Sequence, residues 1–380
     1  MPTSYLHMPI IEYNPDYFDA LQELVAQVPR LMNLAHRPFV DYYYASRSWC
    51  KLYLSLSESG KVVATLGREL RRFEHNSREV TIRTGSNWFS LRPGAGRQLS
   101  RYSAMSNPDS YGMVLMASPI AVAALSHMNW APVRGVTGYF LNGCSLRPWS
   151  SWWKSAANLL VRQVAGKRIS KLRSRVPADV TSRISIREEF SYVADLLPQR
   201  SPFSFRFSPN IEYLDWRYNL SLSFVRYRLF RIMSESQSVG YVILNDAPDQ
   251  MIVAQCDADD ATVLAYGVLR AILEAGQNDR TPRSVFLSCS HSEMRPIFEN
   301  FGFRKWFRED LPFGFLDLPP MIDRAPDISS WLVNYDWSDN GLQAPFLDQR
   351  GAELRPTMRQ IAAIPIAKKF PPAGKPRRDC

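Results

Sequence analysis

The stretch "WFSLRPGAGRQLSRY", Trp88 to Tyr102, places an aromatic segment directly before two glycines and a polar helical pattern. We expect a strand that runs into Leu91 and a helix over 97–105, joined by Gly94-Ala95-Gly96. Unpaired backbone N–H groups and the positive end of the helix dipole attract anions at such a junction. A Pro-Gly turn that only joins a strand to a helix would give the same sequence, so both interpretations stay open.

The surrounding residues predict a sheet with helices packed on it. Leu52, Leu54 and Leu56 alternate, a turn follows at 58–60, and the pattern resumes at Val62, which is typical of a β-hairpin. The other elements expected in this half are a helix over 17–28, strands over 79–84, 113–117 and 133–140, and a helix over 120–128.

The same order of elements recurs in the second half of the chain. A second Ser-Glu-Ser turn at 234–236 lies 177 residues after the first, and Phe303 lies 173 residues after Trp130 at the ends of two strand-helix units. The predicted elements are strands over 227–233, 239–244, 251–255 and 285–289, and helices over 261–274 and 293–301. Duplication of a whole domain explains both offsets; chance alignment of two common motifs is the alternative.

We therefore expect an α/β (α+β) fold of two tandem domains, each a mixed, mostly antiparallel sheet flanked by helices. The expected boundaries are 1–148 for the first domain, 149–184 for a basic, Trp-rich linker helix, 185–341 for the second domain, and 342–380 for a basic, Pro-rich flexible tail.

Composition narrows the possible partners and compartments. The formal net charge of +10 favours anionic partners. Five cysteines lie far apart with no CxxC pair, which argues against a zinc site and a disulfide scaffold, so we expect no metal. The first residues lack a signal-peptide pattern, and no apolar stretch is long enough to cross a bilayer. These features predict a cytoplasmic protein.

The order strand, hairpin, glycine turn, helix, strand and helix resembles the GNAT acyltransferase fold. "EYLDWRYN" (212–219), "NFGF" (300–303) and "DISSWLVNYDWSDNG" (327–341) are similar to segments of a tandem GNAT-like subgroup often encoded near bacterial surface-polysaccharide genes. "YLDWRY" is the most specific of the three, and the resemblance covers roughly residues 5 to 341.

The resemblance implies an acyl-CoA site at the glycine turn of the first domain, with acetyl-CoA or another acyl-CoA as co-substrate. The implied cofactor-binding residues are Phe89, Ser90, Leu91, Arg92, Gly94, Ala95, Gly96 and Arg97. Leu91 departs from the family, which has Arg or Gln at that position. The equivalent turn of the second domain carries Asp257, Asp259 and Asp260 without a glycine, and this acidic turn would repel a pyrophosphate.

The acceptor side of the predicted site is less marked in the sequence. Trp216, Arg217 and Tyr218 are candidates for substrate binding by stacking and bidentate hydrogen bonds; packing of a helix onto the sheet is the alternative. No catalytic residue is identified, because His127 and Tyr102 qualify by type only. Cys289 and His291 are adjacent in sequence, and adjacency does not make a catalytic pair.

The basic helix over 151–176 admits three roles: a clamp between the domains, a contact with an anionic membrane surface, or a dock for an acidic partner. Nucleic acid is a further possible partner, although no nucleic-acid-binding module is recognisable. The resemblance implies an N-acyltransferase acting on an amine, such as an amino sugar in polysaccharide biosynthesis, and we expect it in the cytoplasm or peripheral to the inner membrane. The alternatives are a Fem-like transferase that takes aminoacyl-tRNA, and a non-catalytic GNAT-like scaffold.

Overall fold

The computed structural model describes residues 8–115, 119–128, 130–141, 171–247, 250–277, 283–305, 314–317 and 327–337. The linker expected over 149–184 falls largely outside these residues, and the tail over 342–380 falls wholly outside them. Within the described part of the chain, no helix is long and apolar enough to cross a membrane.

The first sheet has the strand order β1-β2-β3-β4-β5-β15-β6, and β9 pairs with β3 beyond this path. Neighbouring strands are antiparallel except β4 and β5. The strands are β1 (Ile10–Glu12), β2 (Cys50–Leu56), β3 (Val62–His75), β4 (Arg78–Ser90), β5 (Tyr111–Leu115), β6 (Ala131–Val133), β9 (Phe205–Phe207) and β15 (Gly314–Leu316).

The second sheet has the order β14-β7-β13-β12-β11-β10-β8, and here β12 and β13 are the parallel pair. Its strands are β7 (Thr137–Leu141), β8 (Ile184–Glu189), β10 (Tyr227–Ser234), β11 (Gln237–Asp246), β12 (Gln250–Ala258), β13 (Ser284–Cys289) and β14 (Arg304–Lys305). The expected fold class, two mixed and mostly antiparallel sheets flanked by helices, is confirmed.

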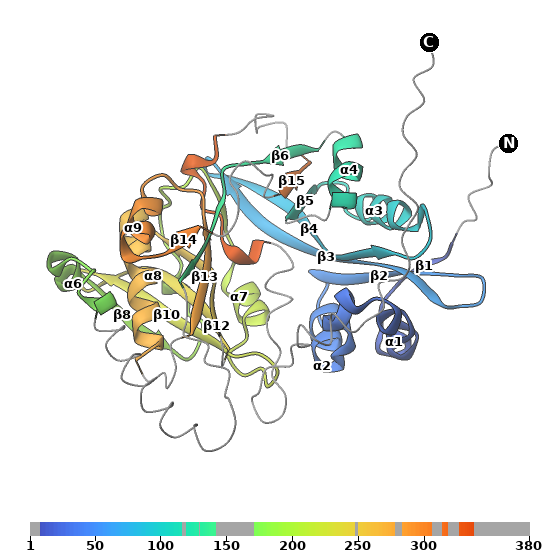
Figure 1. Cartoon of the computed structure of the whole chain (residues 1–380), viewed down its shortest axis with the longest axis horizontal. Helices are drawn as coiled ribbons and strands as arrows, with labels where there is room; N and C mark the ends of the chain where they lie inside the picture. The colour runs from blue at the N-terminus through green and yellow to red at the C-terminus, as the bar shows by residue number, and fades with distance from the viewer. Residues whose placement is uncertain are drawn as a thin grey trace, which may run out of the picture.

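Helices cover both faces of the first sheet because successive strand residues point to opposite sides. Leu52 and Leu54 pack under α1 (Phe18–Gln27) and α2 (Arg37–Val40), whereas Tyr53 and Leu66 pack under α3 (Ala95–Met105). Figure 1 shows α1 and α2 below this sheet and α3 and α4 (Pro119–His127) above it. The other α-helices are α6 (Ala178–Arg183), α7 (Ile211–Arg217), α8 (Ala261–Ala275) and α9 (Met294–Phe301). The short 3₁₀ helices are η1 (Pro15–Tyr17), η2 (Pro29–Ala35), η4 (Ala194–Leu196), η5 (Ile328–Ser330) and η6 (Tyr335–Trp337), and η3 (Asp41–Ala45) is a π-helix.

Two local predictions differ from the structure. The strands expected over 79–84 and into Leu91 form the single long strand β4. The strand expected over 133–140 is two strands, β6 and β7, which belong to different sheets. Gly135 separates them with a φ of +85°, a left-handed backbone conformation that glycine adopts without strain, and the chain changes sheets there.

The two sheets exchange strands. β7, from the first half of the chain, lies between β14 and β13, while β15, from the second half, lies between β5 and β6. Each sheet is therefore built from both halves of the sequence, although the predicted domain boundaries assign each strand to one domain.

A buried ion cluster joins β3 to the last described segment. Arg217 Nε lies 3.2 Å from a carboxylate oxygen of Glu69, and Arg217 Nη2 lies 2.9 Å from Asp336 Oδ1. Arg71 Nη2 lies 2.8 Å from the second oxygen of Glu69, and its Nη1 donates to the Asp336 carbonyl. Because η6, which carries Asp336, packs against β12 and β13, the cluster links the two sheets.

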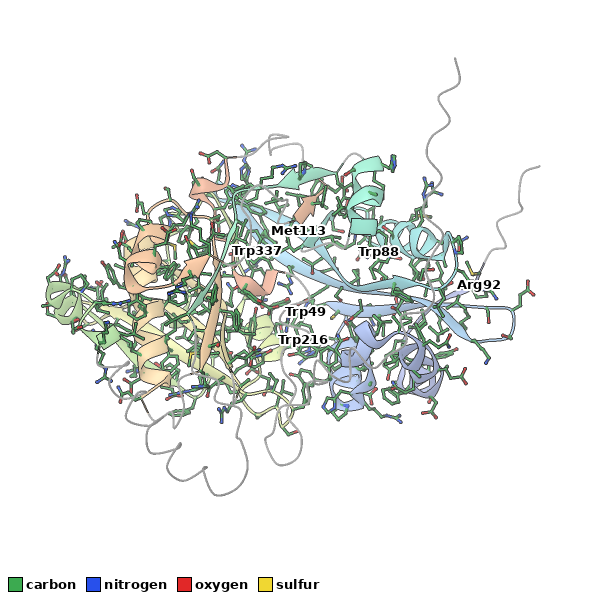
Figure 2. All side chains as sticks on the ribbon, in the orientation of Figure 1. Trp49, Trp88, Arg92, Met113, Trp216 and Trp337 are labelled. Atoms are coloured by element: carbon green, nitrogen blue, oxygen red, sulfur yellow. The ribbon has the colours of Figure 1, made fainter. Side chains whose placement is uncertain are left out.

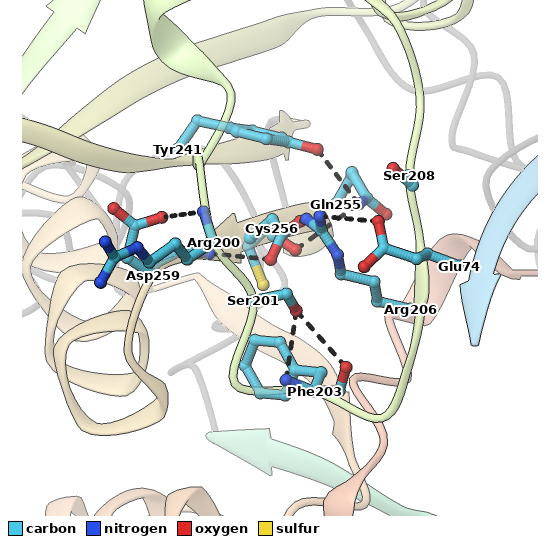
Figure 3. Close-up of polar contacts among 12 residues, drawn as sticks. Glu74, Arg200, Ser201, Phe203, Arg206, Ser208, Tyr241, Gln255, Cys256 and Asp259 are labelled. Carbon is cyan, nitrogen blue, oxygen red and sulfur yellow. Dashed lines mark hydrogen bonds and ion pairs between the residues drawn. The ribbon is translucent and has the colours of Figure 1, made fainter. Parts of the chain in front are cut away.

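A second ionic contact joins the sheets near β9. Arg206 Nη2 lies 3.2 Å from Glu74 of β3, and its Nη1 pairs with Asp257 of β12. Figure 3 shows Arg206 directed toward Glu74 at this junction. Aromatic rings fill the space between these contacts: Trp337 packs edge-on against Phe73 and Phe205.

The ion cluster predicts a large stability effect. Glu69→Gln keeps the shape of the side chain but leaves Arg71 and Arg217 with only Asp336 as a buried counter-charge, so we expect a loss of about 3 kcal/mol or more in the free energy of unfolding. Glu79→Gln is the matched control, because Glu79 pairs with Arg72 at the surface, and it should change the free energy by less than about 1 kcal/mol. Equal urea midpoints for the two variants would contradict this account.

Candidate functional site

The parallel strands β4 and β5 separate soon after they meet. They pair only from Ile82 opposite Tyr111 to Thr84 opposite Met113, and both continue beyond this point. A β-bulge follows in β4, where the register with β3 shifts between Thr65 and Gly67, and Asn87 adopts a φ of +49°. A bulge leaves an extra residue out of the ladder and bends the strand. The divergence opens the sheet on the side of α3 and α4.

A cavity of about 130 Å³ lies in this opening. Apolar side chains of both strands and both helices form most of its wall, and four charged residues lie among them: Arg68, Arg83, Asp317 and the exposed Arg101. The apolar lining includes Leu66, Trp88, Ala104, Met113, Val114, Leu125, Met128 and Trp130. Asp317 follows β15, so the second half of the chain contributes to the cavity.

The predicted glycine turn forms the start of α3. Gly94 is the N-cap residue with a φ of +85°, and no side chain caps the helix. The indole Nε1 of Trp88 donates to the carbonyl of Gly96 at 3.0 Å, and a Cβ on Gly96 would lie only 3.1 Å from that nitrogen. The left-handed backbone favours glycine at position 94, and the close approach of the Trp88 indole favours it at position 96. The turn also leaves the first N–H groups of α3 without a capping side chain.

The other predicted cofactor residues lie around this turn. Phe89 and Ser90 end β4, Ala95 is buried as the first residue of α3, and Leu91, Arg92 and Arg97 are exposed. Trp88 lines the cavity and its indole bonds Gly96, so the turn lies next to the cavity; the turn and the cavity together are called the groove below. Figure 2 shows Trp88 beneath α3 and Met113 farther along the same side of the sheet, with Arg92 at the outer end.

The second sheet contains the same divergence of parallel strands, but the chain itself fills it. β12 and β13 pair only from Gln250 to Ile252, and β12 carries a bulge near Ala254. The Asn334 amide accepts from the Cys256 N–H at 3.3 Å and donates to the Cys256 carbonyl at 3.0 Å. The hydroxyl of Ser288 donates to the carbonyl of Val333.

Little space remains in the second opening. The cavity there measures about 10 Å³, and Leu332, Val333 and Asn334 form part of its wall. At the start of α8, the carboxylate of Asp260 accepts from the Val263 N–H, so a side chain of the protein occupies the anion-attracting end of that helix. Asp259 accepts from the backbone N–H of Arg200 (Figure 3).

Trp216, Arg217 and Tyr218, predicted to contact substrate, lie in the interior with 4%, 0% and 0% of their surface exposed. Arg217 belongs to the ion cluster, and Trp216 packs edge-on against Tyr213. Burial alone would raise the pKa of Glu69, but Arg71 and Arg217 outweigh it and lower that pKa. The geometry agrees with helix packing, the alternative interpretation of this segment.

The residues considered by type for catalysis are dispersed. His127 is exposed near the end of α4, and Tyr102 packs against Tyr53 with 38% of its surface exposed. Burial raises the pKa of the Cys289 thiol to about 12, and burial lowers the pKa of His291. The described ranges contain no cluster of three or more His, Cys, Asp or Glu residues that could hold a metal ion.

No protein-family model matches the sequence, and no curated protein matches it. Among solved structures, a putative acetyltransferase from Pyrococcus horikoshii is 11% identical over 88% of this chain and 97% of its own, with a TM-score of 0.50. N-myristoyltransferase from Saccharomyces cerevisiae, with bound myristoyl-CoA and inhibitors, is 11% identical over 87% of each chain, with a TM-score of 0.51. These two likenesses show the fold. A tandem GNAT protein from the clavulanic acid biosynthesis pathway also matches, at 11% identity and a TM-score of 0.43, over 82% of this chain and 97% of its own.

The filled second opening predicts a specific stability effect. Asn334→Ala removes the partners of the Cys256 N–H and carbonyl, so we expect a loss of about 2 kcal/mol in the free energy of unfolding. The control Asn300→Ala changes an exposed residue of α9 and should shift that free energy by less than about 0.5 kcal/mol. Urea denaturation measures both, and an Asn334→Ala midpoint equal to that of the wild type would contradict the role given to this amide.

Proposed function

We propose that this protein transfers an acyl group from an acyl-CoA to an amine, and that the donor binds in the groove between α3 and α4 of the first sheet. The observation that carries the proposal is the contrast between the two strand divergences. One is filled by residues 332–334 of the chain itself, and the other leaves a cavity of about 130 Å³ beside a helix start without a capping side chain.

The groove offers a suitable environment along the length of an acyl-CoA. At its outer end, the N–H groups of the first turn of α3 and the side chains of Arg92 and Arg97 would hold the pyrophosphate. Farther in, Leu66, Met113 and Leu125 give the apolar wall that an alkyl chain requires. The bound donor supplies an activated thioester, and the backbone at the β4 bulge, out of the regular ladder, would hydrogen-bond its carbonyl oxygen.

The size of the cavity favours a short acyl group. A protein cavity of about 150 Å³ holds benzene, so a space of 130 Å³ suits a group of about six heavy atoms. Acetyl-CoA is therefore the first donor to test. From the family resemblance, we also propose an amino sugar of a surface polysaccharide as the acceptor. A cytoplasmic location and a membrane contact through the basic residues 151–176 are further proposals, and the membrane contact rests on charge.

Donor binding should depend on charge at Gly94. Asn and Asp have nearly the same shape and both tolerate the left-handed conformation of this residue, so Gly94→Asn and Gly94→Asp differ mainly by one negative charge. We expect the Asp variant to bind acetyl-CoA about tenfold or more weakly than the Asn variant, with one site per wild-type chain. Isothermal titration calorimetry gives both quantities, and equal thermal midpoints of the two variants are the folding control.

Three outcomes would overturn parts of this proposal. A folded wild type that binds no CoA thioester would eliminate the acyl-CoA donor and leave the Fem-like and scaffold alternatives. Co-purified tRNA would then favour the Fem-like transferase. Two sites per chain would show that the second strand divergence opens to ligand.

A further inference from the structure

Two buried arginines lie on the inner wall of the open cavity. Arg68 of β3 and Arg83 of β4 have 5% and 9% of their surface exposed, and both line the cavity together with Asp317. They reach this wall because each lies on the strand face that α3 covers, as Leu66 does.

Neutral groups hold the two guanidinium groups in place. Arg68 donates to the side-chain oxygen of Asn107 at 2.6 Å and to the Ser48 carbonyl at 3.1 Å, while its buried Nε has no hydrogen-bond partner among the described residues. Arg83 donates from Nη1 to the carbonyl and the hydroxyl of Ser110 at 2.8 and 2.7 Å.

The other buried arginines of the described chain are all paired with carboxylates. Seven arginines are buried, and five of them form ion pairs with Asp or Glu: Arg71, Arg206, Arg217, Arg231 and Arg283. Arg68 and Arg83 form no ion pair within the described ranges. The two exceptions thus share one cavity, in a fold that otherwise neutralises its buried arginines.

The electrostatics of the cavity favour an added negative charge. Burial lowers the pKa of Arg83, Asp317 opposes the shift, and the charge of Arg68 adds to it. An arginine nevertheless keeps its charge at neutral pH, so the two guanidinium groups repel each other in a mostly apolar space. One half-buried carboxylate, Asp317, cannot neutralise both charges.

We infer that the inner end of this cavity binds a carboxylate of a substrate, held by the guanidinium groups of Arg68 and Arg83. The planar, forked guanidinium group is suited to a carboxylate, and the limited volume of the cavity admits a small one. The inference rests on the proposed transfer from acyl-CoA to an amine. The carboxylate belongs either to the acyl group, as in a dicarboxylic acyl-CoA, or to the amine acceptor.

Two pairs of probes separate these sources. Succinyl-CoA and butyryl-CoA both carry a four-carbon acyl group and differ in the terminal carboxylate, and calorimetry compares their affinities. As model acceptors we use β-alanine and β-alaninamide, which differ in having a carboxylate or a neutral amide. Saturation-transfer NMR compares their binding with and without acetyl-CoA. We expect a preference of about tenfold or more for the carboxylate in one pair. A preference in the first pair assigns the charge to the acyl group, and one in the second pair assigns it to the acceptor.

Variants connect the preference to the two residues. Arg68→Gln and Arg83→Gln should each reduce it to threefold or less, while Arg68→Lys and Arg83→Lys should restore part of it. Arg78→Gln, at the exposed β3–β4 hairpin, should leave it unchanged. Unmodified CoA, which has no acyl group, should bind all folded variants with similar affinity.

The outcomes distinguish this inference from the proposed function. No carboxylate preference in either pair, in a wild type that binds CoA, overturns the inference and leaves the acyl transfer intact. If the wild type binds no CoA thioester but prefers β-alanine in an Arg83-dependent way, the acyl-CoA proposal fails and the carboxylate site stands. A preference that survives both Gln variants overturns the assignment to Arg68 and Arg83.

Discussion

The divergence of two parallel strands is the constraint on which both halves of this fold depend. Where such strands separate, their backbone N–H and C=O groups lose their ladder partners and need others. In the second sheet, the Asn334 amide bonds the freed N–H and C=O of Cys256, and the hydroxyls of Ser288 and Ser290 hold the segment that carries Asn334 by donating to the Val333 and Trp331 carbonyls. In the first sheet the divergence stays open and a cavity forms. The same divergence of parallel strands is therefore filled by the chain in the second sheet and leaves a candidate ligand groove in the first.

The groove depends on parts of the chain that are far apart in sequence. Asp317 reaches the cavity because β15 pairs with β5, and the segment that contains Asp336 joins the sheets through Arg71 and Arg217. Figure 2 shows Trp337 and Trp216 between the two sheets. The buried residues Trp216 and Arg217 thus belong to the packed interior between the two sheets.

The sequence predicts the fold well where the signals are local. Periodicity and turn residues predict the hairpins, the helix over 261–274 and the glycine turn, and the predicted positions lie close to the observed ones. The bulge at Asn87 interrupts the alternation of β4, which explains why one strand was expected as two. The exchange of β7 and β15 has no local signal, because a strand's partner is set by the whole topology.

The candidate site was predictable only in part, because some of its residues come together only through the pairing of strands. The turn at Gly94 lies within one short segment, whereas Arg68 and Arg83 come together only when β3 and β4 pair and α3 covers them. A weak signal existed: each is a charged residue on the strand face whose neighbours are apolar or small. The burial of Arg217 had no local signal either, because its partners Glu69 and Asp336 are distant in sequence.

The strand exchange also has a consequence for the order in which the chain folds during synthesis. The ribosome releases β6 long before β15, yet β15 must enter between β5 and β6. The first sheet therefore stays incomplete, with two strand edges facing a gap, until nearly all of the described chain has emerged. Either half expressed alone would retain such an unpaired edge, which is a site for association with other chains. The strand exchange therefore prevents either half of the sequence from completing a sheet on its own.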